Sequence, residues 1–267
     1  MPPANFTMNK DKDVLGHQKR SSEEESSLQT IEPKKRKLQR TVMNASEELN
    51  FMYNPVFLPF LLHFYIAKEL FHRNVGKNTN EGLPRKTVKN HHDAIDSIVY
   101  LDNPELLKTF EEKKTQFQRE GKVDKYGNAT EKLLFHGTCN ESINLIAEDN
   151  FSLEALPDER GKIMLFGRGM YFSELPGVSL MYGEKLLVCK VLLGKTQKYY
   201  PDGSYPPDIK EEFDSRVVIK DGLEVVTVIK SPSQILPYCM INLKDNVTEQ
   251  AGQVSKPAIT NINMSLP

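Results

Sequence analysis

Two short stretches of the sequence combine residue types that bind and orient small polar molecules. In residues 135–138, Phe-His-Gly-Thr, an apolar run ends in a histidine beside a glycine. A histidine ring offers one hydrogen-bond donor and one acceptor, and a glycine allows close backbone approach. In residues 166–173, Phe-Gly-Arg-Gly-Met-Tyr-Phe-Ser, two glycines precede Tyr171, and Ser179 and Tyr182 follow farther along the chain.

Each stretch taken alone has an ordinary structural explanation. A histidine at the end of a strand more often has a structural role than a catalytic one. The Gly-x-Gly of residues 167–169 lacks the third glycine of a dinucleotide-binding fingerprint, and neighbouring tyrosines usually pack in a core. The combination in this order, followed by apolar runs at residues 225–230 and 234–243, is much more specific.

The elements that must position these residues follow from the hydrophobic pattern. Residues 186–193, 223–229 and 235–243 are short apolar runs separated by loops with glycine and proline, which is typical of strands. Asp102-Asn103-Pro104 predicts a helix start, and residues 142–147 predict a short helix. The pattern therefore predicts an α+β fold with a mostly antiparallel sheet and a few flanking helices.

In this order and spacing, the patterns resemble the catalytic domain of the poly(ADP-ribose) polymerase family. The resemblance covers residues 92–244 and includes the segments 98–116, 213–217 and 234–238. It implies the ADP-ribosyltransferase fold, a split and mostly antiparallel sheet with flanking helices that clamps NAD+ in an extended groove. It implies NAD+ as co-substrate and no metal.

The resemblance implies that the end of the first strand binds the two riboses and the amide of NAD+. His136 would hold a ribose hydroxyl, and its imidazole would suit a diol as donor and acceptor. Gly137 would offer its backbone N–H and C=O to the nicotinamide amide, which requires close approach without a Cβ. Thr138 would contact the adenosine-side ribose.

The second stretch would hold the nicotinamide ring. Tyr171 and Tyr182 would stack on its two faces, and Ser179 would hydrogen-bond its carboxamide. Cleavage of the nicotinamide–ribose bond gives an oxocarbenium-like centre, so orientation and charge stabilisation matter more than a strong protein nucleophile. By this resemblance, His136 and Tyr171 are the catalytic candidates.

One position departs from the polymerising members of the family. They carry a glutamate eight residues before the glutamine that opens the last strand motif, and the count back from Gln234 reaches Val226. A valine cannot polarise the hydroxyl of an acceptor ADP-ribose. Glu224 lies two positions earlier, on the same strand face by the period of two, and is the alternative carboxylate.

The resemblance and this departure predict an NAD+-dependent transferase of the glycosyltransferase class that adds a single ADP-ribose to protein side chains. The alternative is a catalytically inactive module that keeps the fold and binds NAD+ or a partner. The loop of residues 154–165 borders the expected groove, and its inward folding would favour the inactive reading. The sequence leaves the acceptor residue type and the oligomeric state open.

Four regions are expected along the chain. Residues 1–45 read as a disordered tail with basic and acidic clusters, and residues 46–91 as an apolar helical segment and linker. Residues 92–245 are expected to form the catalytic domain, and residues 246–267 a polar C-terminal tail. The apolar stretch 51–67 is interrupted by polar residues and prolines, so we expect it to be buried or partner-bound rather than membrane-spanning.

Composition limits the remaining function classes. The chain has 267 residues and a formal net charge of -1, which excludes a global basic field for nucleic acid, and no specific nucleic-acid partner is predicted. Three dispersed cysteines argue against a disulfide framework and for a reducing compartment. The basic cluster at residues 33–37 is either a nuclear import signal or a solvated charge run, so nucleus and cytoplasm are the expected locations.

Overall fold

The computed structural model describes residues 38–44, 58–75, 94–154, 164–202 and 206–244. All of these belong to one compact unit, Lys35–Pro267, and the other unit, Met1–Lys34, lies wholly outside the described residues. The basic cluster 33–37, the linker after residue 75, most of the loop 154–165 and the tail 246–267 also fall outside them, so expectations there stay predictions.

Within the described part of the chain, the larger sheet has five strands, each antiparallel to its neighbours. In sheet order they are β1 (Gln39–Asn44), β2 (Ile95–Asp102), β9 (Ile235–Leu243), β5 (Lys185–Leu192) and β3 (Glu131–Thr138). The inner strands β5 and β9 are mostly apolar and mostly buried, since residues of both strand faces are covered.

The second sheet has four strands among the described residues: β4 (Met170–Phe172), β8 (Leu223–Ile229), β7 (Ser215–Lys220) and β6 (Thr196–Tyr199). Only the β6–β7 pair in it is parallel. The two sheets join where Phe135 and Ser173 exchange backbone hydrogen bonds of 2.8 and 2.9 Å. The predicted α+β fold with a split, mostly antiparallel sheet is confirmed.

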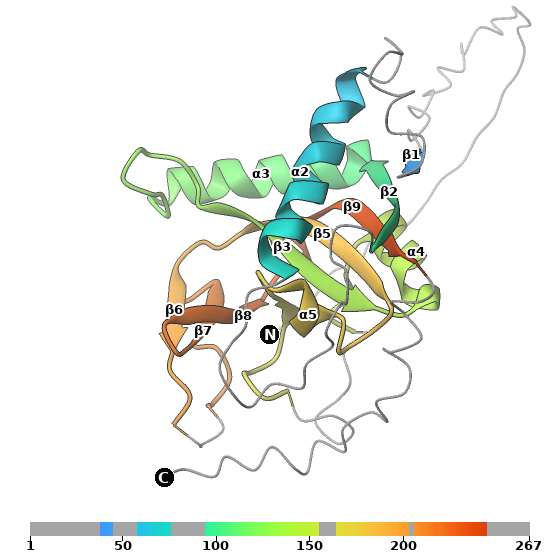
Figure 1. Cartoon of the computed structure of the whole chain (residues 1–267). Coiled ribbons are helices and arrows are strands. Elements are labelled where there is room, and N and C mark those ends of the chain that lie inside the picture. The colour runs from blue at the N-terminus through green and yellow to red at the C-terminus, as the bar shows by residue number, and fades with distance from the viewer. Residues whose placement is uncertain (1–37, 45–57, 76–93, 155–163, 203–205, 245–267) are drawn as a thin grey trace, which may run out of the picture. The chain divides into compact units, whose positions relative to one another are not determined.

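Helices flank this pair of sheets (Figure 1). In the described ranges they are α2 (Leu58–Val75), α3 (Pro104–Arg119), α4 (Asn140–Asp149), α5 (Pro176–Ser179) and the 3-10 turn η3 (Pro232–Gln234). The predicted start of α3 is confirmed, because the Asn103 side chain caps the helix by accepting a hydrogen bond from the Leu106 N–H at 3.3 Å, and Pro104 is the first helical residue. The predicted helix at 142–147 corresponds to α4.

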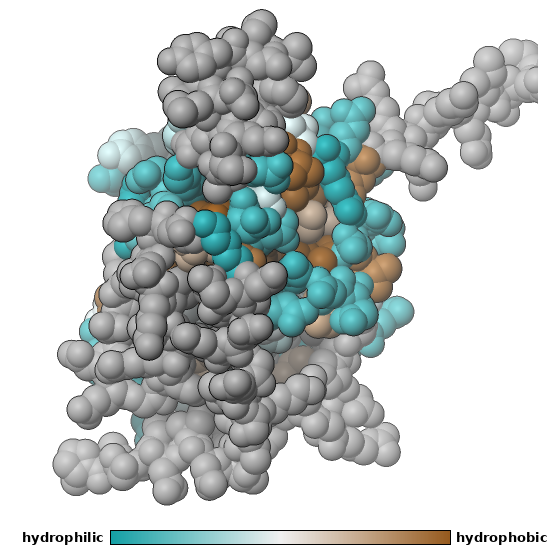
Figure 2. All heavy atoms as spheres, turned by 45° about the vertical axis from the view of Figure 1, so that its right-hand side comes forward, coloured by the Kyte–Doolittle hydropathy of each residue, from teal (hydrophilic) through white to brown (hydrophobic). Residues whose placement is uncertain are grey.

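Helix α2 contains the second half of the apolar stretch 51–67. It packs against β2, β9 and α5, and it buries Phe64, Ala67 and Phe71 in a shared core. None of the helices in the described ranges is long and apolar enough to cross a membrane. On the face shown in Figure 2, hydrophilic side chains surround smaller hydrophobic areas.

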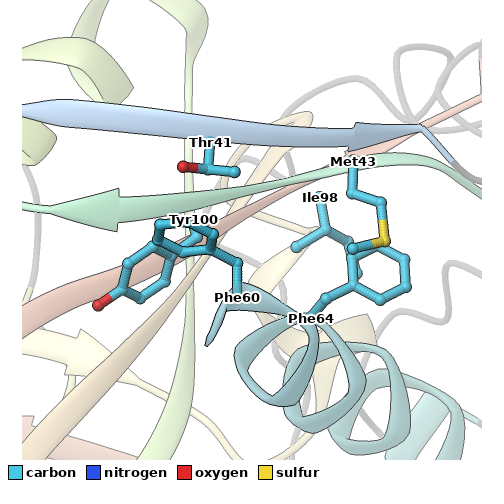
Figure 3. A pocket seen from close by; sticks show the side chains of 6 residues that line it. All are labelled: Thr41, Met43, Phe60, Phe64, Ile98 and Tyr100. Atoms are coloured by element: carbon cyan, nitrogen blue, oxygen red, sulfur yellow. The ribbon is translucent and has the colours of Figure 1, made fainter. Parts of the chain in front are cut away.

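A small apolar hollow lies between α2 and the edge of the larger sheet (Figure 3). Its lining residues come from β1, β2 and α2: Thr41, Met43, Phe60, Phe64, Ile98 and Tyr100. None of the candidate NAD+-site residues, from His136 to Val226, lines it, so it is a packing feature of this edge.

Strand β1 corrects the expected extent of the disordered tail. Residues 39–44 were expected to belong to it, but they pair antiparallel with β2, with Val42 opposite Val99 and Met43 opposite Ile98. The prediction failed because it rested on composition, in which isolated apolar residues among polar ones indicate a disordered tail. The edge of β2 supplies these residues with hydrogen-bonding partners, which composition does not show.

We expect Met43→Ala to lower the free energy of unfolding by about 2–3 kcal/mol, because Met43 is 3% exposed and packs with Phe64 and Ile98. The neighbouring Val42 is 48% exposed, so Val42→Ala is the matched control and should cost no more than about 0.5 kcal/mol. Urea denaturation measures both. Equal losses would mean that β1 is not held by this contact.

Candidate active site

The His136 ring at the end of β3 is held on two sides. Its Nδ1 lies 2.9 Å from the carbonyl oxygen of Tyr171. The ring also meets Phe151 edge-on at a centroid distance of 4.8 Å and Phe172 at 5.5 Å. Since a carbonyl oxygen only accepts hydrogen bonds, Nδ1 carries the proton, and in the neutral ring Nε2 is left as an acceptor.

The protonation state of His136 follows from the same surroundings. Burial lowers its pKa below the ordinary value, and the hydrogen bond to the Tyr171 carbonyl opposes this shift without cancelling it. The ring is therefore neutral near physiological pH, and Nε2 can accept a hydrogen bond from a hydroxyl. From the sequence, the His136 ring was expected to offer the ligand both a hydrogen-bond donor and an acceptor. In the structure Nδ1 is already used, so the ring offers the ligand only an acceptor.

Gly137 is required by the protein itself. A Cβ at this position would lie 1.7 Å from the carbonyl oxygen of Ser179 and 2.5 Å from its carbonyl carbon. The Ser179 hydroxyl in turn donates a hydrogen bond to the carbonyl oxygen of Phe135 at 3.0 Å. The glycine thus lets the end of α5 lie directly on β3, which is a different reason from the approach of a nicotinamide that the sequence suggested.

The chain after α5 also lies against the end of β3. A Cβ on Gly183 would sit 2.0 Å from the carbonyl oxygen of Thr138, whose side chain is buried. Tyr182, the residue before this glycine, is 64% exposed. The structure therefore brings the segment of Ser179 and Tyr182 next to the residues 136–138, and Tyr182 is largely exposed to solvent.

The phenol of Tyr171 is fixed by the preceding turn. Its oxygen donates to the carbonyl of Gly167 at 2.7 Å and accepts from the backbone N–H of Phe166 at 3.0 Å. Burial raises its pKa to about 12, so the phenol stays protonated. Tyr171 lies on β4, and its backbone carbonyl accepts the hydrogen bond of His136, so the two candidate catalytic residues are directly linked.

Val226 lies on β8 and is buried. It packs with other aliphatic side chains, among them Leu175, Val178, Val218, Val225 and Val228. An aliphatic neighbourhood provides neither charge nor lone pair for an acceptor hydroxyl.

The period of two predicted that Glu224 and Val226 share a strand face, but in the structure they do not. Val218 pairs with Val226, but Ile219 pairs with Glu224, so Val225 has no partner of its own in the ladder. Such a bulge breaks the alternation of faces between the two positions. The same-face expectation is wrong, because a local register shift is invisible to a pattern argument.

The Glu224 carboxylate is also engaged. It accepts a short hydrogen bond from the Lys132 ammonium, which lies 2.7 Å from the Glu174 carboxylate as well. These three residues come from β8, β3 and the segment after β4, so the cluster ties the two sheets together. Among the described residues, no group of three or more His, Cys, Asp or Glu is placed to hold a metal ion.

The family model of the poly(ADP-ribose) polymerase catalytic domain matches residues 75–235, which is more than half of the chain. The chain belongs to the poly(ADP-ribose) polymerase catalytic-domain family. A comparison with curated proteins finds no match. The family transfers ADP-ribose from NAD+, and the α+β architecture of the chain is the one expected of it.

The poly(ADP-ribose) polymerase match includes every residue that the motifs singled out, from His136 to Val226, and it begins at the last residue of α2. The individual residue roles stay predictions. Three features of the structure bear on how NAD+ would fit. His136 Nε2 is a hydrogen-bond acceptor, the Tyr182 ring is exposed, and the Ser179 hydroxyl already donates its proton to Phe135.

Sequence reasoning missed two residues of this site. Phe151, just after α4, supports the His136 ring from the side, and no motif pointed to it. Arg216 was noticed only within the segment 213–217, although a cation inside the apolar run Ser-Arg-Val-Val-Ile was itself a signal of a special environment.

Proposed function

We propose that the protein transfers a single ADP-ribose from NAD+ to a side chain of an acceptor protein and releases nicotinamide. The observation that carries the single-unit product is the surroundings of Val226. This position is aliphatic and packed among aliphatic side chains. The nearby Glu224 is bound to Lys132, and a register shift in the pairing of β7 with β8 turns it to the other face of the strand.

The first transfer does not need the missing carboxylate. The nicotinamide–ribose bond breaks with its electron pair leaving on nicotinamide, and the acceptor side chain forms the new bond to the ribose carbon. An acceptor carboxylate or thiolate supplies its own nucleophile. The protein then contributes orientation. His136 Nε2 accepts a hydrogen bond from a ribose hydroxyl, Tyr171 and Tyr182 flank the nicotinamide ring, and Ser179 contacts its amide.

Elongation makes a different demand. It requires a protein group that activates a hydroxyl of an ADP-ribose already attached, and hydroxyls of this kind are weak nucleophiles without a base. The side chain at position 226 offers no such group.

Incubation of the purified protein with labelled NAD+, followed by gel electrophoresis and mass spectrometry, tests the proposal. We expect discrete additions of one ADP-ribose and no ladder. Val226→Glu should not create chains, since it places a carboxylate among aliphatic side chains, and it should lower labelling instead. The matched control Val226→Ile keeps the apolar surface and should label like the parent. Ladders from the parent protein would overturn the single-unit proposal.

The inactive alternative gives a different result in the same experiment. A protein that binds NAD+ or nicotinamide in calorimetry, but transfers no label and releases no free nicotinamide, would be a binding module. The loop whose inward folding would favour that reading lies mostly at residues 155–163, outside the described part of the chain.

Location and partners complete the proposal. Protein acceptors are the expected partners, and the nucleus and cytoplasm are the expected compartments. Support comes from the three cysteines, which are all free thiols, two of them buried, as suits a reducing compartment.

A further inference from the structure

Arg216 on β7 is the largest fully buried side chain of the described residues, at 1% exposure. Its five N–H groups make five hydrogen bonds. Two go to the amide oxygen of Gln197, at 3.1 and 2.8 Å. The other three go to backbone carbonyls, those of Phe166 at 2.8 Å, Pro207 at 2.9 Å and Asp208 at 3.3 Å. All of the donors of the guanidinium are therefore used.

The acceptors of Arg216 are neutral. No ion pair between it and a carboxylate is formed within the described ranges, and the five hydrogen bonds go to four neutral groups, one side-chain amide and three backbone carbonyls. Burying a cation in this way is costly, and well-packed apolar side chains would stabilise a core equally well. A fully satisfied buried cation is better explained by the geometry that it imposes on its partners than by stability.

The geometry concerns the turn that carries Tyr171. Arg216 binds the carbonyl of Phe166, and the N–H of the same residue donates to the Tyr171 phenol. The phenol donates to the carbonyl of Gly167, and a Cβ on this glycine would lie 3.1 Å from the Arg216 guanidinium. The turn is thus held between the cation on one side and the phenol on the other.

A second bond fastens the same turn to the 207–208 segment. The backbone N–H of Arg168 donates to the Asp208 carboxylate at 2.8 Å, while Arg216 holds the carbonyl of that aspartate. Arg216 therefore connects two loops that the sequence separates by about 40 residues, and both loops precede strands of the smaller sheet.

The strands place Arg216 and Tyr171 on one face of the smaller sheet. Arg216 pairs with Val228, and Val228 pairs with Tyr171, so the three residues form one row across β7, β8 and β4. Gln197 extends this row on β6. Paired residues of neighbouring strands point to the same face, so the row joins a buried polar network to the ring of Tyr171.

We infer that Arg216 is a positioning residue for NAD+: it fixes the 166–168 turn and through it the plane of the Tyr171 ring. This inference rests on the proposed function, in which that ring contacts nicotinamide. Arg216 acts only through the turn and touches no substrate.

Arg216→Lys tests the inference, because a lysine keeps the charge but cannot make five hydrogen bonds to four acceptors from one planar group. We expect the KM for NAD+ to rise about tenfold with kcat within about twofold of the parent, since a looser ring weakens donor binding. Tyr171→Phe keeps the ring and removes the hydroxyl, and it should raise the KM for NAD+ by a similar factor. The double variant should show no further increase, because both changes release the same turn.

A nuclear magnetic resonance signature separates this inference from the proposed function. With tyrosine labelled at the ring carbon that bears the hydroxyl, the Tyr171 signal is assigned by its loss in Tyr171→Phe. Arg216→Lys should shift that signal whether or not the protein turns over NAD+. The control Arg119→Lys, an exposed arginine of α3, should leave both the signal and KM unchanged.

The outcomes are distinct. An unshifted Tyr171 signal in a folded Arg216→Lys protein would overturn the inference, as would additive effects in the double variant. A fall in kcat at constant KM would also overturn it, since that is the result of a smaller folded fraction. A shifted signal in a protein whose parent neither binds nor cleaves NAD+ would support the positioning of Tyr171 and reject the proposed function.

Discussion

His136→Ala is expected to reduce NAD+-dependent labelling at least about a hundredfold, the order of loss that accompanies a misplaced substrate. The substitution removes Nε2, the acceptor that the neutral ring presents, and it removes the ring that packs against both Phe151 and Phe172. Labelled NAD+ measures the loss, and unfolding in urea checks that the protein is still folded. Labelling equal to the parent would mean that the NAD+ site lies elsewhere.

A matched variant sharpens this test. His136→Gln keeps an acceptor oxygen as many bonds from the backbone as Nε2, on a more flexible group without a ring, so this variant should recover part of the activity. Full loss in both variants with an intact fold would assign the effect to ring packing against the phenylalanines instead of to Nε2.

The pH profile should report the same group. Burial lowers the pKa of His136, so the ring stays neutral through its ordinary titration range and protonates only at a lower pH. Labelling should therefore persist below pH about 6.5 and fall at more acidic values. Stability follows the same sign: the unfolded chain binds the proton more readily, so the contribution of this residue is lost as the pH falls.

Gly137→Ala should have the second large effect, a destabilisation of about 3 kcal/mol or more together with loss of labelling. Its Cβ would lie 1.7 Å from the Ser179 carbonyl oxygen, and a backbone atom cannot move aside as a flexible side chain can. The end of α5 would have to leave β3, taking Ser179 and Tyr182 with it. Chemical denaturation and labelled NAD+ measure the two effects.

Gly127→Ala is the control for a glycine that only serves conformation. Its φ is +80°, and a Cβ there would meet nothing within 4 Å, so the cost is backbone strain of about 1–2 kcal/mol without an effect on labelling. If Gly137→Ala were no more harmful than Gly127→Ala, the close contact between α5 and β3 would not be essential.

Patterns along the chain predicted the parts of the fold that depend on local chemistry. The start of α3 could be predicted because Asn103 and Pro104 act on their own neighbours. The strands β5 and β9 could be predicted because a mostly apolar run indicates burial. The family was readable because His136, Tyr171, Ser179 and Tyr182 keep their order.

Features that depend on distant partners were not readable. Strand β1 exists because β2 has a free edge, and composition carries no information on that edge. The bulge beside Val226 is set by the pairing of β7 with β8. Gly137 is required because of the close contact with Ser179, 42 positions later in the chain. The tautomer of His136 is set by the carbonyl of Tyr171, which belongs to the other sheet.

The junction between the two sheets has a thermodynamic consequence. The carbonyl of Phe135 accepts hydrogen bonds from both the Ser173 N–H and the Ser179 hydroxyl, and the adjacent His136 takes its orientation from Tyr171 across the same junction. A donor molecule that contacts His136 and Tyr171 together can recognise only the state in which both sheets are joined. Its binding energy therefore adds to the cooperativity of the whole domain, and partly folded chains with one sheet formed gain nothing from it.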